Sequence, residues 1–146
     1  RTYVSGDAYG TSVTNYGAFN RLGANKTPSF ECTNTADLYT VGSANSGNKA
    51  LDYPIGLITA DEVAYAGGVV GQNNNGYYLY TNQYYWTMSP SLFGGGHAYG
   101  FFVDSDGSLD YGDGVDYARG VRPVINLRAD IQKLGGTGTA DDPYVV

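Results

Sequence analysis

Apolar and polar positions along the chain alternate in short runs, and most runs are bounded by Gly, Pro, Asn, Asp or Ser. Short runs rich in aromatic and β-branched residues are typical of strands. Asn75-Gly76 and the segment 104–107 are typical hairpin turns, and Ser89-Pro90 is expected to end a strand. The pattern predicts a mainly β domain with strands at residues 55–58, 77–80, 84–89, 99–103, 108–111, 121–127 and 143–146, of which 121–127 is expected to lie in the core.

One helix is clearly marked. Thr59 and Glu62 have the spacing of a capping box, and Gly67 is placed to end the helix in a left-handed conformation. We therefore expect about two helical turns after Thr59. Asp61 and its neighbours could also be catalytic, but helix capping accounts for Thr59 and Glu62 without any chemistry. A second short helix is expected around residues 13–22.

Composition favours one extracellular domain spanning residues 1–146. Charged residues make up 15% of the chain, against about 25% in typical globular domains, while Gly (22) and Tyr (15) are abundant. Surfaces kept soluble by Asn, Thr, Ser, Gly and Tyr are common on secreted, cell-surface or pilus proteins. No stretch approaches the roughly 20 apolar residues of a membrane span. The chain opens on Arg1-Thr2-Tyr3 without a leader, so we expect it to be the soluble head of a longer precursor.

The net charge of −6 is concentrated in one segment, because residues 104–116 hold five Asp and no Lys or Arg. An acidic chain without a basic patch is a poor candidate for binding nucleic acid or an anionic membrane surface. The Asp-rich segment could hold calcium weakly, since hard cations prefer several carboxylate oxygens. The EF-hand register is not met, and a hairpin turn with exposed Asp side chains explains the segment without an ion. We expect no cofactor.

Other potential chemistry is sparse. Cys32 is the only cysteine, so no intrachain disulfide can form; we expect a small buried residue, the alternative being a reactive or intermolecular thiol. His97 is the only histidine, and no Gly-x-Ser-x-Gly motif accompanies it. One His and one Cys exclude a zinc site. The glycine-rich segments 94–96 and 135–139 lack phosphate-loop and dinucleotide motifs and are expected to be turns. Arg122 is expected to pair with a loop Asp.

Four stretches carry a resemblance to a known family: residues 53–67, 84–90, 118–127 and 138–146. Together they resemble surface domains of Gram-positive, largely gut-dwelling bacteria, related to the formylglycine-generating-enzyme branch of the C-type-lectin-like fold. The resemblance implies an α+β domain with one or two short helices, a twisted antiparallel sheet and neighbouring termini. Such domains occur on secreted or anchored proteins, including pilin-like ones.

The same fold hosts the variable proteins of diversity-generating retroelements, in which the segment before the last strand contacts ligand. The corresponding stretch here is about residues 91–117. The Glu-Pro-Asn and Trp-Asn-Asp signatures of calcium-dependent lectins are absent, as are the paired cysteines of the oxidising enzyme. Neither calcium-dependent sugar binding nor the enzyme's activity is therefore carried over.

These observations predict a non-enzymatic extracellular recognition or adhesion domain whose ligand is a protein or a glycan. Strands at 84–88 and 121–127 would form the frame, and residues 91–99 and 104–117 the binding surface. We expect replacement of Tyr111 and Tyr117 together to abolish ligand capture with little change in melting temperature. The candidate contacts are Phe93, His97, Tyr99, Asp110, Tyr111, Asp113, Asp116 and Tyr117.

Two other functions remain open on the sequence. The chain could be the head of a pilin or filament subunit whose main partner is itself, with aromatic patches as subunit interfaces. It could also be a carboxylate-dependent glycan-processing enzyme, because the separation of paired carboxylates is a three-dimensional quantity that spacing does not give.

Overall fold

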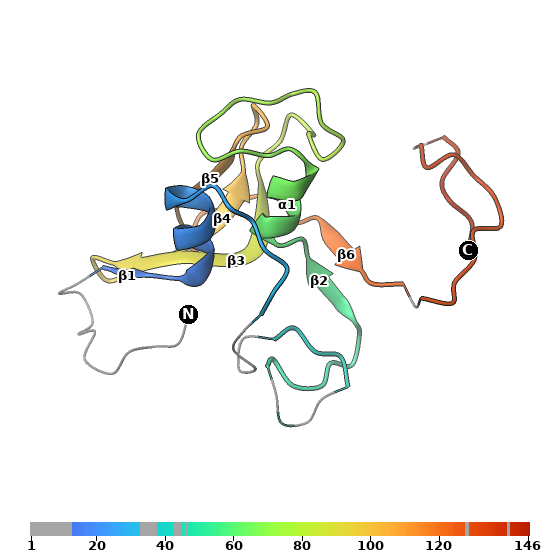
Figure 1. Ribbon diagram of the computed structural model, residues 1–146, viewed down its shortest axis with the longest axis horizontal. Helices are drawn as coiled ribbons and strands as arrows, with labels where there is room; N and C mark the ends of the chain where they lie inside the picture. Colours follow the sequence, from blue (N-terminus) through green and yellow to red (C-terminus); the bar gives the residue numbers. More distant parts are fainter. Residues whose placement is uncertain (1–12, 33–37, 43–44, 46, 128, 140) are drawn as a thin grey trace.

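The protein is an α+β domain with a curled antiparallel sheet and two short helices (Figure 1). The computed structural model describes residues 13–32, 38–42, 45, 47–127, 129–139 and 141–146. The closeness of the two termini, which the resemblance implies, involves residues outside these ranges. In chain order the elements are β1 (Thr14–Asn15), the π-helical η1 (Phe19–Ala24), β2 (Ile55–Leu57), α1 (Ala60–Ala66), β3 (Tyr85–Gly94), β4 (His97–Val103), β5 (Leu109–Gly114) and β6 (Pro123–Ile125).

The main sheet has the strand order β1-β3-β4-β5, and all neighbouring strands are antiparallel. A tight turn at Gly95 and Gly96, both with positive φ, joins β3 to β4. The turn at 104–107 joins β4 to β5, as the sequence predicts. A separate two-stranded ribbon pairs β2 with β6. The ribbon lies beside the main sheet, and the C-terminal segment extends beyond it (Figure 1).

The α1 helix has the ends that the sequence predicts. The Thr59 hydroxyl accepts from the backbone N–H of Glu62 at 3.1 Å, and the Glu62 carboxylate accepts from the backbone N–H of Thr59 at 2.7 Å. Gly67 ends the helix with φ +118. This reciprocal arrangement satisfies two N–H groups at the helix start. The second helix was expected around residues 13–22. Residues 14–15 instead form β1, and the helix η1 covers residues 19–24, so it begins and ends later than expected.

The hydrophobic core lies between the inner face of the main sheet and the two helices. Its centre is formed by aromatic and aliphatic side chains that are almost fully buried. Residues from η1, α1 and three strands contribute, so the core connects segments far apart in sequence. The buried members are Ala18, Leu22, Ile58, Ala60, Val63, Leu79, Tyr85, Phe101, Val103 and Leu109.

Two expectations about the aromatic strands are wrong. Residues 77–80 form a turn rather than a strand. Strand β3 does not end at Ser89-Pro90 but continues to Gly94. The strand passes through Pro90 because the register between β3 and β4 shifts on either side of it, and a bulge is a position where the missing proline N–H is tolerated.

The expectation of a core strand at 121–127 is also wrong. Strand β6 covers only Pro123–Ile125, and it pairs with β2 rather than joining the main sheet. It therefore forms no frame with the segment 84–88. The bridge to that segment joins Tyr85 to Gly120, which precedes both β6 and the expected strand. Residues 143–146 form no strand, and only an isolated bridge joins Val145 to Gly135. Cys32, expected to be buried, is exposed.

The hydroxyl group of Tyr77 is a polar group buried next to the hydrophobic core. It has no hydrogen-bond partner among the residues that the structure describes, while the nearby Tyr85 hydroxyl donates to the Leu79 carbonyl at 3.0 Å. Burial raises the pKa of Tyr77 above its usual range, because a phenolate would lose its hydration. The folded protein therefore resists ionisation that the unfolded chain undergoes near pH 10.

The variant Tyr77→Phe should match or exceed the wild-type stability at pH 7, by up to about 1 kcal/mol, because it removes an unsatisfied buried hydroxyl. Wild-type stability should be fully present below about pH 10 and fall as the pH rises further, since only the unfolded state then loses the Tyr77 proton. The variant should show a smaller fall in melting temperature between pH 9 and pH 12. Tyr78→Phe, at an exposed neighbouring ring, is the control and should follow wild type throughout. Parallel curves for wild type and Tyr77→Phe would contradict this assignment.

Candidate functional site

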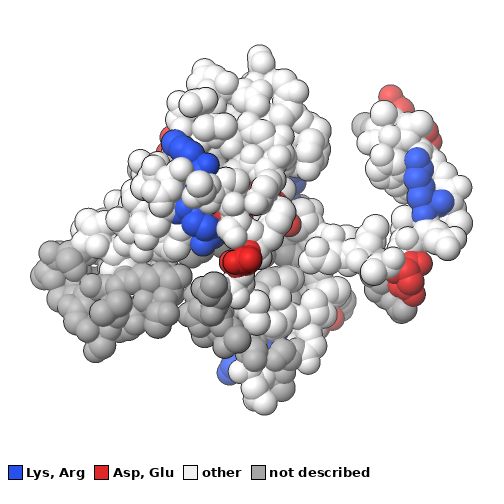
Figure 2. All heavy atoms as spheres, viewed as in Figure 1, with Lys and Arg blue, Asp and Glu red and all other residues white. Residues whose placement is uncertain are grey.

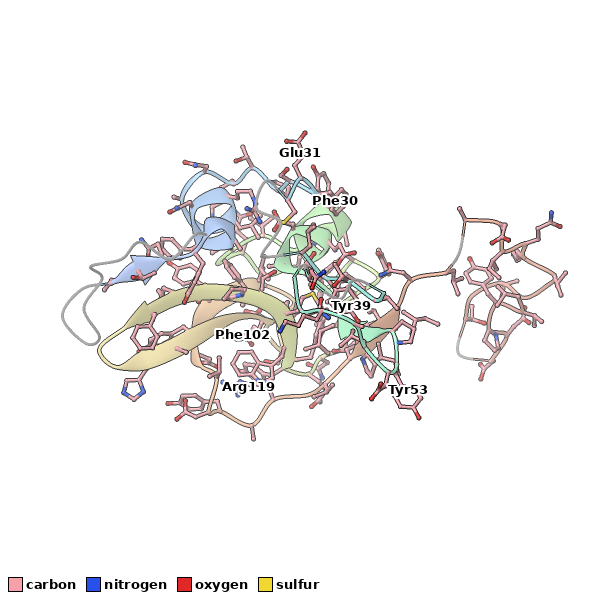
Figure 3. The ribbon with its side chains drawn as sticks, turned by 90° about the horizontal axis from the view of Figure 1, so that it is seen from below. Phe30, Glu31, Tyr39, Tyr53, Phe102 and Arg119 are labelled. Atoms are coloured by element: carbon pink, nitrogen blue, oxygen red, sulfur yellow. The ribbon has the colours of Figure 1, made fainter. Side chains whose placement is uncertain are left out.

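A cluster of aromatic and charged side chains surrounds Arg119 on the face of the main sheet away from the core. The Arg119 guanidinium lies 4.3 Å from the ring centroid of Tyr84, 5.5 Å from that of Phe102 and 5.7 Å from that of Tyr117. Its Nε donates to Asp113 Oδ2 at 2.8 Å, and its Nη2 donates to the same oxygen. We call these five residues the Arg119 cluster. Figure 3 shows Phe102 and Arg119 together on one side of the β3–β4 hairpin.

Backbone hydrogen bonds hold the cluster in place. The N–H of Gly120 donates to the Tyr84 carbonyl at 2.9 Å, and the N–H of Trp86 donates to the Gly120 carbonyl at 3.0 Å. The segment that carries Arg119 is therefore tied to the start of β3. At its other end, the N–H of Val115 donates to the Ala98 carbonyl at 3.0 Å. The guanidinium reaches the sheet because both ends of residues 115–119 are anchored to it.

Strand alternation places the aromatic floor of the cluster on the face away from the core. Trp86 pairs with Phe102 across β3 and β4, and their rings pack edge to face at 5.9 Å. Adjacent residues on a strand point to opposite faces, so Tyr85 and Phe101 face the core instead. Gly100 permits this arrangement, because a Cβ there would meet the Trp86 ring at 3.3 Å.

The structure brings some of the sequence-predicted contacts together and separates others. Asp113 and Tyr117 belong to the Arg119 cluster, and the exposed Asp116 lies in the same turn. Asp110 pairs with Phe102 across β4 and β5. Its carboxylate accepts from the backbone N–H of Gly112 at 3.1 Å, so it stabilises its own strand.

The remaining predicted contacts lie at the far end of the β3–β4 hairpin. His97 is exposed and its ring lies 6.4 Å from that of Tyr99, which is half-buried. Tyr99 precedes Gly100, so strand alternation directs it to the face opposite Trp86. Phe93 is half-buried and pairs with Thr14 and Ala98. These three residues therefore form a group separate from the Arg119 cluster.

Tyr111 packs against the core. Its ring lies 4.9 Å from that of Phe19 and 5.9 Å from that of Phe101. Loss of this ring would remove buried apolar contacts, so Tyr111→Ala is expected to lower the melting temperature. The expectation that Tyr111 and Tyr117 can be replaced together with little thermal effect therefore no longer holds, and only the exposed Tyr117 suits such a test.

The arginine that pairs with an Asp of the segment 104–116 is Arg119, not Arg122 as expected. Arg122 Nη1 donates to the Leu79 carbonyl at 2.8 Å, and its guanidinium lies 5.4 Å from the Tyr85 ring centroid. The sequence analysis did not identify three aromatic residues of this surface. It placed Tyr84 and Trp86 in the frame, and it placed Phe102 in the strand 99–103 without a functional role. Their alternation with Tyr85 and Phe101 was the available signal.

The Asp-rich segment does not gather into one site. Asp106 accepts from the backbone N–H of Ser108 at 2.9 Å, and this hydrogen bond holds the pKa of Asp106 below its usual value. Asp104 accepts from the Ser105 hydroxyl, while Asp113 pairs with Arg119. In the part of the chain that the structure describes, no three His, Cys, Asp or Glu side chains converge as metal ligands would.

Over the same residues, no helix has the length and apolar character needed to traverse a bilayer.

A crevice of ≈680 Å³ lies on the other side of the hairpin, between η1, α1 and the segment around Tyr39. The side chains of Phe30 and Glu31 lie there in Figure 3. Arg21 and Asp61 form a bidentate pair in its wall, with Nε–Oδ1 at 2.9 Å and Nη2–Oδ2 at 2.6 Å. The bond to Asp61 raises the pKa of Arg21. Because Asp61 is fully engaged in this pair, it serves the fold rather than acid–base chemistry.

No family model, curated protein or solved structure matches the chain.

Proposed function

We propose that the protein is a non-enzymatic extracellular recognition domain that binds its ligand on the Arg119 cluster. The cluster contains two tyrosines and an arginine, and the Trp86 ring packs against its Phe102. Tyrosine, tryptophan and arginine are the residue types that dominate binding hot spots. Tyr117 is exposed and Tyr84 is partly exposed, so both rings are accessible to a partner.

The unused hydrogen-bonding capacity of Arg119 is the observation that carries the proposal. Its Nε and Nη2 bind Asp113, whereas Nη1 makes no hydrogen bond to any residue in the described part of the chain. The side chain is only 21% exposed. A guanidinium held rigid by a ring and a carboxylate, with one edge still able to donate, is well prepared to bind a carbonyl or hydroxyl oxygen of a ligand.

The surrounding charge favours a ligand that is not strongly anionic. Asp113 compensates Arg119, and Asp116 adds a negative charge in the same turn. Aromatic contact and hydrogen bonding would therefore supply most of the binding energy at the cluster. A neutral glycan surface or a protein surface offers both. Figure 2 draws the opposite side of the molecule, which carries η1 and α1 and on which Lys, Arg, Asp and Glu side chains lie close to one another.

The fold proposed for this function is the C-type-lectin-like fold, on a secreted, surface-anchored or pilus protein. An antiparallel sheet with two short helices is compatible with it. Within that fold, the turn at 115–119 occupies the region before the last strand, where variable proteins of diversity-generating retroelements contact ligand.

A binding panel tests the proposal. Purified protein would be applied to a glycan array and to immobilised extracellular-matrix proteins, and any binding would be quantified by interferometry. Tyr117→Ala and Arg119→Gln are each expected to weaken binding at least about tenfold, as hot-spot truncations do.

Tyr78→Ala is the matched control, since it removes an exposed ring from a turn outside the cluster. It should bind like wild type. All three variants should be checked for an unchanged circular dichroism spectrum. Absence of any wild-type binding across the panel, or full retention of binding by Tyr117→Ala and Arg119→Gln, would contradict the proposed site.

A further inference from the structure

A row of apolar side chains is exposed on the β2–β6 ribbon. Ile55 and Ile125 face each other across the two strands and are 54% and 61% exposed. Val121 and Leu127 continue the row at the alternate positions of the same extended segment and are 68% and 57% exposed. We call these four residues, with Pro123 between them, the apolar row.

The opposite face of the ribbon is already covered. Val124 packs against the hydrophobic core, and its cross-strand partner Gly56 lies against Tyr39 and Met88. Val124 thus attaches the ribbon to the core on one face, whereas the apolar row on the other face is exposed. Apolar side chains gathered on an exposed face mark a surface that associates with a partner.

The C-terminal segment, residues 131–146, offers a cover of matching chemistry. We call it the arm. Leu134 is 76% exposed, and Tyr144, Val145 and Val146 are also exposed beside it. The hydrogen bonds and ring contacts of the arm's described residues all join two residues of the arm, such as Leu134 N–H to the Val145 carbonyl at 2.8 Å. The arm is therefore closed on itself and makes no such bond to the body.

Both surfaces expose large apolar side chains. The four aliphatic members of the apolar row are 54 to 68% exposed, and Leu134, Tyr144, Val145 and Val146 of the arm are 53 to 76% exposed. Their burial against each other would remove this apolar area from water.

We propose that the arm of one copy packs on the apolar row of a second copy, and that the two copies exchange arms reciprocally. In both Figure 1 and Figure 3 the arm extends away from the ribbon, so it does not cover the apolar row of its own chain. A second copy supplies the arm and receives one in return, which gives a closed two-fold dimer with two equivalent contacts. The contact uses none of the five residues of the Arg119 cluster.

Analytical ultracentrifugation over about 1 to 100 μM tests the exchange. Wild type is expected to sediment as a dimer that dissociates on dilution. Ile125→Asp in the apolar row and Leu134→Asp in the arm should each weaken the dimer at least about tenfold, because each places a charge in both contacts. Tyr78→Asp introduces the same charge at an exposed ring elsewhere and should leave the dimer unchanged.

Mixing the two variants separates arm exchange from other arrangements. A pair of one Ile125→Asp chain and one Leu134→Asp chain contains one intact contact, formed by the unmodified arm and the unmodified row. The mixture should therefore form more dimer than either variant alone. Leu134→Asp alters only the arm. It therefore still tests the dimer contact if Ile125→Asp disturbs the folding of the ribbon.

Three results would overturn the proposal. The first is a wild-type chain that stays monomeric at all concentrations, as it would with the arm folded back on its own ribbon or with another partner on the row. The second is a wild-type dimer that neither variant weakens. The third is a wild-type dimer with no recovery on mixing the two variants.

Discussion

Asp61→Ala is expected to lower the free energy of unfolding by about 3 kcal/mol, near the lower end of what breaking a buried ion pair costs. The Asp61 side chain is almost completely buried and pairs with Arg21 through two hydrogen bonds. It also accepts from the backbone N–H of Ser29 at 2.9 Å. Removing the carboxylate would leave these donors without their partner and would release the segment after Ser29 from α1.

Urea denaturation of Asp61→Ala and of Asp52→Ala, an exposed Asp, would measure this effect against a matched loss of charge. A double-mutant cycle with Arg21→Gln would isolate the pair itself and should give a coupling of about 1 to 3 kcal/mol. If Asp61→Ala unfolds within about 0.5 kcal/mol of Asp52→Ala, as surface substitutions do, the pair does not hold the segment.

Gly107→Ala should destabilise the protein by about 3 kcal/mol and lower its melting temperature by roughly 10 °C. Gly107 has φ +83, and a Cβ there would overlap the carbonyl oxygen of Asn74. The loop that contains Asn74 rests on this turn, since the Asn74 N–H donates to the Asp106 carbonyl at 3.1 Å. A methyl group would therefore both strain the turn and displace the loop.

Gly112→Ala on the neighbouring strand is the control, because only the Asp110 carboxylate lies near its added Cβ, at 3.6 Å. It should change the melting temperature by no more than about 3 °C. Hydrogen exchange at the Asn74 amide should accelerate in Gly107→Ala and not in Gly112→Ala. Equal melting temperatures for the two variants would show that the loop moves aside at little cost.

Local signals in the sequence predicted the parts of the fold that depend on local interactions. Thr59, Glu62 and Gly67 define the ends of α1 through hydrogen bonds within the helix itself. The turn at 104–107 likewise depends on its own Asp and Gly residues. The expectation of an α+β domain with a curled antiparallel sheet is confirmed at that level.

The errors arose where distant contacts decide the outcome. Residues 77–80 have strand-like composition, but Tyr77 and Leu79 pack into the core from a turn. Pro90 ends a strand by local rules, yet the bulge opposite Gly100 accommodates it. The segment 121–127 was expected to be a core strand, yet only Val124 packs against the core, while Val121, Ile125 and Leu127 are exposed.

The candidate site was predicted only in part, because it too depends on contacts between residues that are distant in sequence. Asp113 and Tyr117 were chosen from composition, and both contact Arg119. Arg119 itself was missed, because its partners Tyr84 and Phe102 come from strands that approach it only after folding. Tyr111 could not be distinguished from Tyr117 by sequence, since only the position of Phe19 shows that Tyr111 packs inward.

Anchoring of residues 115–119 at both ends has a consequence for how this surface can change. Asp113 and the Ala98 carbonyl fix the entry to the turn, while Arg119 and Gly120 fix its exit. The intervening positions 115–118 are exposed and contribute no buried side chain. Substitutions at these four positions, in evolution or in a randomised library, can therefore change the surface chemistry without changing the sheet that supports it.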